Sequence, residues 1–261
     1  MKYRLLTLAL LGATCITPVA NAAQVRVTVT NLAPQNGTFL TPVWLGFHDG
    51  GFDLYDLGAP AASFVERVAE DGNTAELTTA FSVAGYSQQT TLTSGGMMPV
   101  FAPGVSNSFV FDLDPTQDRY FSFLSMVIPS NDAFIGNGNP IGHEIFDASG
   151  NFLGHDFIFV GANVRDAGTE INDESHGNTA FFGQAAPNTG INENGVITVH
   201  SGFIPGGPIL SDPMFAHADF LQPGYQLARF QVTAVPEPET YAMLLVGLGL
   251  VGYRTMRRRK A

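Results

Sequence analysis

Apolar and polar residues alternate with a period of two over much of the chain. In VRVTVTNL, residues 25–32, Val25, Val27 and Val29 fall on one face and polar residues stand between them. Segments 108–114 and 225–235 continue the alternation. A period of two places apolar side chains on one face of a strand and polar side chains on the other. These segments are therefore predicted to be strands with one buried face.

Two further runs, 119–128 and 155–164, carry Phe, Ile and Val more densely. Such density is typical of strands buried on both faces, so we expect both runs in the centre of a sheet. Groups of Gly, Asn, Asp and Pro separate the predicted strands and indicate turns. One of them, DASGNFLGHDF at 147–157, is typical of a hairpin turn that joins two strands.

One segment, residues 59–81, has the period of a helix. Ser63 is placed to cap the start of this helix, Gly72 is placed to end it, and residues 74–81 predict a second short turn. The predicted fold class is therefore all-β, an antiparallel β-sandwich with one short helical insertion.

The first 22 residues have the composition of a secretory signal peptide. Lys2 and Arg4 form a basic start, an apolar centre follows, and small residues at Ala20 and Ala22 fit the site that signal peptidase cuts. We therefore expect export, with cleavage after Ala22.

The only cysteine, Cys15, lies inside this signal peptide. Lipidation of Cys15 is the alternative, but a lipoprotein site favours a Leu-like residue at Gly12 and Gly, Ala or Ser at Thr14. After cleavage the chain keeps no cysteine, so thiol catalysis is excluded and the fold must be held without disulfides.

Residues 235–261 form a second processing segment. Pro236, Glu237 and Pro238 come first, a continuous apolar run covers 241–253, and four basic residues cover 257–260. As a helix the apolar run is about 20 Å long at about 1.5 Å per residue, a marginal span for a hydrocarbon core of about 30 Å. The basic end is expected to stay cytoplasmic. A core helix is the alternative, which the unpaired basic cluster disfavours.

This tail resembles the PEP-CTERM sorting signal of Gram-negative bacteria. The resemblance implies that an exosortase recognises and cleaves the tail after transient anchoring in the membrane. It also implies that the released protein reaches the cell surface or the surrounding exopolysaccharide matrix.

Removing both segments makes the remaining domain strongly acidic. They contain seven of the 12 Lys and Arg residues and two of the 23 Asp and Glu residues. Residues 23–234 therefore keep 5 basic and 21 acidic side chains, a formal net charge of −16. Such a surface repels nucleic acid and anionic lipid and attracts cations or basic partners. No nucleic-acid partner is expected, and the membrane is contacted only through the transient tail.

Acidic residues gather in VRDAGTEINDE, residues 164–174. Asp166 and Glu170 stand four apart with a glycine between them, which suits a turn that offers oxygen ligands to Ca²⁺, although the spacing is not that of an EF-hand. Taken alone, the run is better explained as a solvated loop. Asp132, directly after the strand 119–128 and its turn, could aim at the same end of the sandwich.

Two motifs carry a resemblance to a known family. SMVIPSNDAFIG at 125–136 resembles the SMI-PSPDWFVG motif of the spondin N-terminal domain, and DAGTE at 166–170 resembles its DAGTD motif. Residues 41–73 are also similar to bacterial members, and the resemblance extends over nearly all of 23–235. It implies an eight-stranded antiparallel sandwich akin to the calcium- and lipid-binding C-two type.

The resemblance further implies one Ca²⁺ held by Asp132, Asp166 and Glu170. The chain departs from the family at Ala133, where the motif has an aromatic residue, and at Glu170, where it has Asp. A Glu side chain still reaches Ca²⁺. Three adjacent carboxylates repel one another, so a bound cation is expected to stabilise the fold. We expect Asp173 and Glu174, by contrast, to face water.

Other candidate sites are weaker. The six histidines lack the paired spacing of zinc hydrolases and are interpreted as surface or turn residues. The loop 47–56 places acids beside aromatic residues and could bind a sugar or a basic peptide, although turns around a core strand explain it as well. No nucleophile elbow or phosphate loop is present in the sequence.

The leading hypothesis is therefore an exported, non-catalytic, calcium-binding sandwich that acts in adhesion to extracellular polysaccharide or matrix protein. A secreted hydrolase with Asp and Glu as acid and base is the alternative from another class. A structural matrix component that binds no metal is the third.

Overall fold

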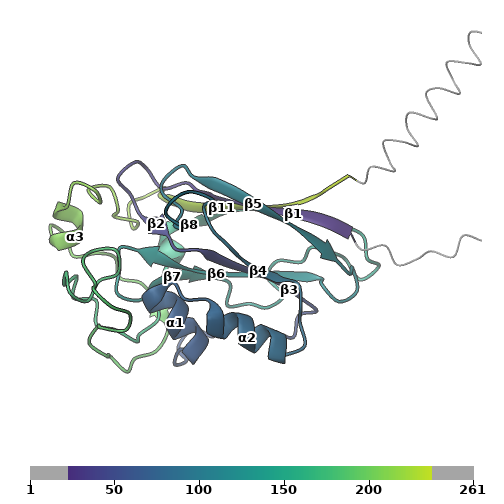
Figure 1. Ribbon diagram of the computed structural model, residues 1–261, viewed down its shortest axis with the longest axis horizontal. Helices are drawn as coiled ribbons and strands as arrows, with labels where there is room; N and C mark the ends of the chain where they lie inside the picture. Colours follow the sequence, from purple (N-terminus) through teal and green to yellow (C-terminus); the bar gives the residue numbers. More distant parts are fainter. Residues whose placement is uncertain (1–22, 237–261) are drawn as a thin grey trace, which may run out of the picture.

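Eleven strands form two antiparallel sheets that face each other as a sandwich (Figure 1). The computed structural model describes residues 23–236. The predicted signal peptide, residues 1–22, and Glu237 and Pro238 of the sorting motif lie outside the described residues. The predicted domain limits therefore stay predictions. The all-β sandwich is confirmed, and eight of its strands have four residues or more.

The smaller sheet has four strands in the order β5-β1-β11-β8. Its strands are β1 (Ala23–Asn31), β5 (Ser106–Leu113), β8 (His155–Val160) and β11 (Gln226–Ala234). The valines of β1 are fully buried and the residues between them are half-buried or exposed, as the alternation predicts.

The larger sheet has seven strands. Six follow the order β10-β9-β7-β6-β3-β4, and β2 pairs with β6. The strands are β2 (Phe39–Leu40), β3 (Val43–His48), β4 (Gln89–Leu92), β6 (Tyr120–Ile128), β7 (Ala133–Gly136), β9 (Arg165–Asp166) and β10 (Thr198–Val199).

The two helices of the predicted insertion cover the outer face of the larger sheet (Figure 1). They are α1 (Ser63–Asp71) and α2 (Ala75–Val83). A second apolar core fills the space between sheet and helices, and it includes Trp44 of β3 and Phe81 of α2 in edge-to-face contact at 5.0 Å. Because cores lie on both of its faces, β6 is buried at every position after Tyr120, and its predicted central place is confirmed.

Local details of the helices differ from the prediction at one end. Gly72 ends α1 with a φ of 65°, a conformation that favours glycine, as predicted. Ser63 does not cap α1, because Ala62 precedes the helix and the Ser63 hydroxyl donates a hydrogen bond to Glu76 of α2. A third, short helix, α3 (Pro208–Ser211), and a 3₁₀ turn at Gly161–Asn163 complete the helical elements described.

The expected central place of the run 155–164 is wrong. The strand formed there, β8, is an edge strand of the smaller sheet. One face is half-buried or, at Phe159, buried, and the residues of the other face are exposed. The preceding turn is tight, as predicted, with Asp147 accepting hydrogen bonds from the backbone of Ser149 and Asn151. It connects Phe146 and Phe152, which form a single β-bridge, rather than two long strands.

Candidate functional site

The predicted calcium ligands meet where β6, β7 and β9 end. Asp132 lies in the turn between β6 and β7, and its carbonyl accepts a hydrogen bond from Ala167 N at 3.2 Å. Ala133, the next residue, pairs with Asp166 of β9. Strand pairing therefore brings together two motifs that are more than thirty residues apart in the sequence.

The Asp132 side chain is fully buried against the second motif. Its Oδ2 accepts hydrogen bonds from Thr169 N at 2.8 Å, Thr169 Oγ1 at 3.2 Å and Glu170 N at 3.1 Å. Its Oδ1 is buried and has no hydrogen-bond partner. Burial, together with the negative charge of Asp166, raises the pKa of Asp132 to about 7.

Glu170 is 2% exposed and has the same one-sided pattern of contacts. Its Oε1 accepts a hydrogen bond from Gly190 N at 2.9 Å, whereas Oε2 is buried without a partner. A Cβ atom at Gly190 would lie 2.0 Å from Glu170 Cδ, so only glycine fits against this carboxylate. Burial and the negative charges of Glu70, Asp132 and Asp71 raise the pKa of Glu170 to about 7.

Asp166 is half-buried, and both of its oxygens have partners. Its Oδ1 accepts a hydrogen bond from Gly168 N at 2.8 Å, and its Oδ2 accepts one from the Asn172 amide at 2.7 Å. Gly168 has a φ of 67°, and a Cβ there would lie 2.6 Å from the backbone of Val196, so the predicted sharp turn requires glycine. A carboxylate offers about four acceptor positions, so two hydrogen bonds leave Asp166 able to accept more.

The three carboxylates are neighbours, but the side chains are not arranged as a finished metal site. Within residues 23–236, no group of three or more His, Cys, Asp or Glu side chains is placed to hold a metal ion. Asp132 and Glu170 nevertheless fit a cation, because each presents a buried carboxylate oxygen that nothing in the described part of the chain satisfies. Buried polar atoms in folded proteins nearly always have a partner.

Comparison with protein families finds matches to two segments of the chain. Residues 32–140 match Spondin_N, and residues 234–260 match the PEP-CTERM protein-sorting motif. The chain carries a spondin N-terminal domain and a PEP-CTERM sorting signal. The spondin match includes Asp132 and ends before the second motif, at which Asp166 and Glu170 lie. A search of curated proteins finds no match to this chain.

Together these two matches indicate an exosortase-sorted extracellular or cell-surface protein. The PEP-CTERM match implies processing by exosortase. Within residues 23–236, no helix is long and apolar enough to cross a membrane.

The expectation that Glu174 faces water is wrong. Glu174 is 2% exposed, and its Oε1 and Oε2 accept hydrogen bonds from Ile204 N and Ile209 N. It therefore fixes the loop that leads into α3. Asp173 is half-buried and accepts hydrogen bonds from Ser175 N at 2.9 Å and from the Asn178 amide at 3.1 Å. Sequence spacing carried no signal for the role of Glu174, because its partners are backbone atoms of a distant segment.

Replacing Glu174 should therefore destabilise the protein without changing its calcium binding. Glu174→Gln keeps one acceptor and turns a donor toward the second backbone N–H, so we expect the free energy of unfolding to fall by about 1–2 kcal/mol. Urea unfolding with and without calcium measures both effects. A variant as stable as the wild type would contradict the capping role of this side chain.

The prediction that the histidines are surface or turn residues fails for two of them. His48 and His200 are buried rather than exposed, and burial lowers the pKa of His48 to about 4. His143 and His155, twelve positions apart, form a hydrogen bond of 2.8 Å between their rings. This bond links the segment that pairs with β6 to β8 of the opposite sheet.

The loop 47–56 contributes mainly to the apolar core of the domain. Phe47, Phe52 and Tyr55 are buried, whereas Asp53 and Asp56 are exposed. The expected ligand site at this loop is therefore limited to one acid, Asp49, which borders a groove.

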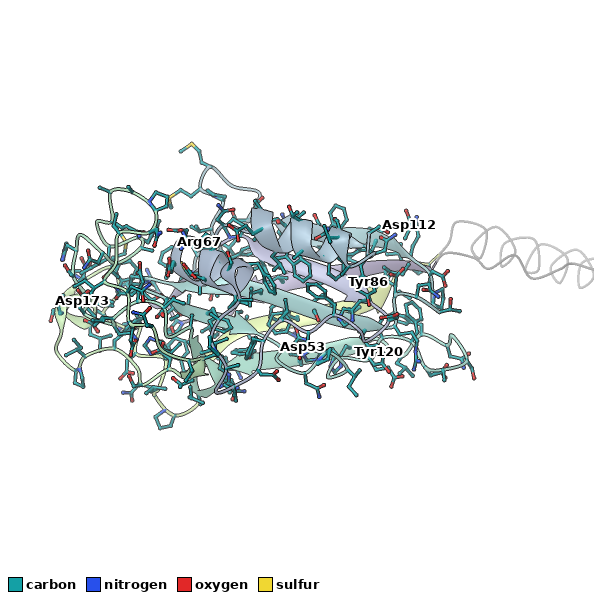
Figure 2. The ribbon with its side chains drawn as sticks, turned by 90° about the horizontal axis from the view of Figure 1, so that it is seen from below. Asp53, Arg67, Tyr86, Asp112, Tyr120 and Asp173 are labelled. Carbon is teal, nitrogen blue, oxygen red and sulfur yellow. The ribbon has the colours of Figure 1, made fainter. Side chains whose placement is uncertain are left out.

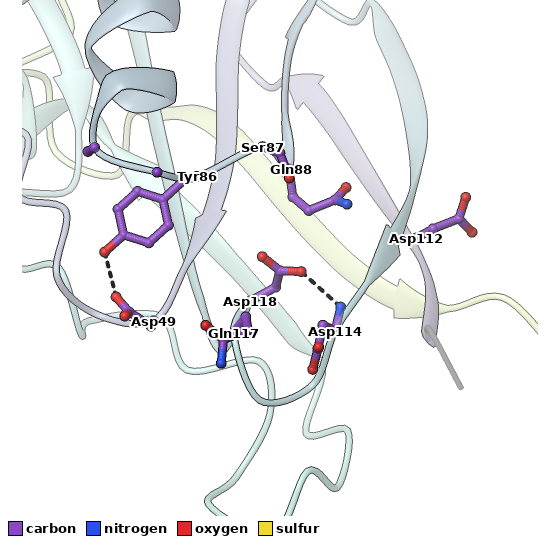
Figure 3. Close-up of a pocket in the computed structure, with 10 residues that line it drawn as sticks. Asp49, Tyr86, Ser87, Gln88, Asp112, Asp114, Gln117 and Asp118 are labelled. Atoms are coloured by element: carbon purple, nitrogen blue, oxygen red, sulfur yellow. Dashed lines mark hydrogen bonds between the residues drawn. The ribbon is translucent and has the colours of Figure 1, made fainter. Parts of the chain in front are cut away.

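This groove has a volume of about 510 Å³ and lies at the end of the sandwich opposite Asp173 (Figure 2). Within the groove, Tyr86 Oη donates a hydrogen bond to Asp49 at 2.6 Å, and Asp114 N donates one to the Asp118 side chain at 2.8 Å (Figure 3). Burial raises the pKa of Asp118 to about 6. The acids of the groove thus have partners that account for their positions.

Proposed function

We propose that this exported domain binds one Ca²⁺ through Asp132, Asp166 and Glu170 and acts, without catalysis, in adhesion at the cell surface or in the extracellular matrix. The observation that carries the calcium proposal is the pair of buried, unpartnered oxygens, Asp132 Oδ1 and Glu170 Oε2. Both belong to residues whose pKa is raised, first by burial and then by the negative charges of nearby carboxylates, and a bound cation would offset both effects.

The chemistry of the ligand set favours Ca²⁺ over softer metals. All three side chains offer carboxylate oxygen, and hard cations such as Ca²⁺ take six to eight oxygen ligands from carboxylates, carbonyls and water. When bound, the cation would neutralise the mutual repulsion of these carboxylates. Asp132 also holds Thr169 N and Glu170 N, so it would couple the ion to the fold of the second motif.

The proposed adhesive role rests on export and charge. The family matches indicate an extracellular or cell-surface protein, and the domain carries a formal net charge of −16. An acidic domain of this kind suits contacts with basic matrix protein, or with extracellular polysaccharide through cations. Signal peptidase and exosortase are the partners proposed for processing.

Calorimetric titration of the metal-free protein tests the calcium proposal. We expect one site for CaCl₂, lost in Asp166→Asn and kept in Asp173→Asn, which removes a nearby charge outside the ligand set. Equal calcium binding by the two variants would exclude Asp166 as a ligand. A titration of the wild type that shows no heat of binding would favour the alternative of a structural matrix component that binds no metal. Glycan and peptide arrays followed by product analysis would detect the hydrolase alternative.

Mass spectrometry of the mature protein tests the sorting proposal. We expect an N-terminus at Ala23 and a C-terminus that lacks residues 257–260, because cleavage by exosortase removes the basic end. Changing Glu237 to Ala should leave uncleaved protein in the membrane fraction. A mature pool that keeps residues 257–260 in the wild type would contradict cleavage of the tail.

A further inference from the structure

The edge strand β8 has a backbone partner on one side only. It pairs with β11 from His155 to Val160, and no other segment within residues 23–236 forms a backbone hydrogen bond or bridge with it. At the other edge of the same sheet, the Asn107 side chain of β5 donates to Thr93 O, directly after β4, at 2.8 Å. The sandwich is therefore joined at its β5 edge and open at its β8 edge.

The composition of β8 does not protect this edge. Proteins usually guard a free edge with Lys, Pro or a charge that faces the missing neighbour. The sequence of β8, HDFIFV, has neither Lys nor Pro. Its one acid, Asp156, is held by Arg229 of β11 through two hydrogen bonds of 2.8 and 2.6 Å. Ile158 and Val160 are 41% and 36% exposed.

The strand is also complementary to a second copy of itself. Residues opposite each other in an antiparallel pair point to the same face, so a two-fold axis must pass through a residue rather than between two. An axis at Ile158 sets Ile158 opposite Ile158, Phe157 opposite Phe159 and Asp156 opposite Val160. This register continues the apolar inner layer across the pair and brings no two like charges face to face.

We propose that two copies of this protein associate through β8, antiparallel and centred on Ile158, so that two four-stranded sheets become one sheet of eight strands. The occupant is a second copy because the register pairs Phe157 with Phe159 on the inner face and Ile158 with its own copy on the outer face. Asp156, opposite Val160, is already neutralised by Arg229. A basic peptide would find no free carboxylate on this edge.

Charge and size set the strength of the association. Six residues make a small interface, below the area typical of stable dimers, and each domain carries a formal net charge of −16. The dimer should therefore be weak in dilute solution and should strengthen as salt screens the repulsion between copies. A partner recognised by charge would show the opposite dependence on salt.

Sedimentation of the mature protein over a range of concentrations tests the proposal. We expect a monomer–dimer equilibrium in the wild type that shifts toward dimer as NaCl rises. Ile158→Lys should be monomeric, because two Lys side chains would face each other on the axis. Leu221→Lys is the matched control, since Leu221 is 43% exposed and lies outside β8, and it should behave as the wild type.

Crosslinking tests the register and does not depend on a destabilising change. The sequence contains one cysteine, Cys15, inside the predicted signal peptide, so the mature chain offers a cysteine-free background. Ile158→Cys should form a disulfide-linked dimer on mild oxidation, because residues opposite each other across antiparallel strands lie within disulfide reach. Leu221→Cys should not. A wild type that stays monomeric at all concentrations and salt levels, or equal crosslinking of the two cysteine variants, would overturn the proposal.

Discussion

Calcium is expected to raise the melting temperature of the mature protein by about 5–10 °C above its value in EDTA. A ligand at about 100 times its dissociation constant stabilises the folded state by about 2.7 kcal/mol. For a domain of this size, 1 kcal/mol shifts the melting temperature by about 2–4 °C. The physical source of this gain is the neutralisation of Asp132 and Glu170, whose buried oxygens lack partners in the absence of a cation.

Thermal scans of three proteins, each in CaCl₂ and in EDTA, check this result. Asp132→Asn should lose the calcium shift, because it removes a proposed ligand charge. Asp118→Asn should keep it, since Asp118 is a buried acid with a raised pKa that lines the groove at the other end of the sandwich. An unchanged melting temperature of the wild type in the two buffers would remove the basis for a calcium site.

In EDTA at pH 8, where no calcium is bound, Asp132→Asn should be more stable than the wild type. Ionised Asp132 is buried and unpaired on one side, and its pKa is raised from 3.8 to about 7. Each pKa unit corresponds to about 1.36 kcal/mol, so the wild type is disfavoured by up to about 4 kcal/mol when this carboxyl is fully ionised. An Asn side chain keeps an acceptor for Thr169 N and Glu170 N without the charge.

The dependence of this difference on pH follows from the direction of the pKa shift. Because the folded pKa lies above the unfolded one, the carboxyl costs nothing below pH 3.8, and the cost grows as pH rises to about 7. The advantage of Asp132→Asn should therefore vanish near pH 4 and level off above pH 7. Comparing the two proteins cancels the effects of the buried histidines, which titrate in both. Chemical unfolding at several pH values in EDTA measures the difference, and a constant difference from pH 4 to pH 8 would contradict the raised pKa of Asp132.

Much of the fold follows from local patterns, and the failures have a common cause. The alternation in β1, the dense run of β6 and the helical period before Gly72 each reflect how a segment meets its own nearest layer. β8 is as rich in Phe, Ile and Val as a central strand, yet it lies at an edge. Strand order depends on contacts between distant segments, which the composition of one strand does not contain.

The candidate site shows the same division. The turn at Gly168 and the meeting of Asp132 with the second motif were predicted from the two motifs, and strand pairing brings them together. Burial of Glu174 was not predictable, because its partners, Ile204 N and Ile209 N, are backbone atoms thirty or more residues away. Acidic residues in one short run looked equivalent in sequence, although each carboxylate meets a different segment of chain.

The pairing of β1 with β11 also places the start and the end of the described domain close together. β1 begins at Ala23, and Val25 lies opposite Ala234, near the end of β11 (Figure 1). The sites at which the signal peptide and the sorting tail join the domain are therefore side by side, at the end of the sandwich far from Asp173 (Figure 2). Under the proposed anchoring by the tail, this geometry would direct the proposed calcium end away from the lipid, where partners and free cations are accessible.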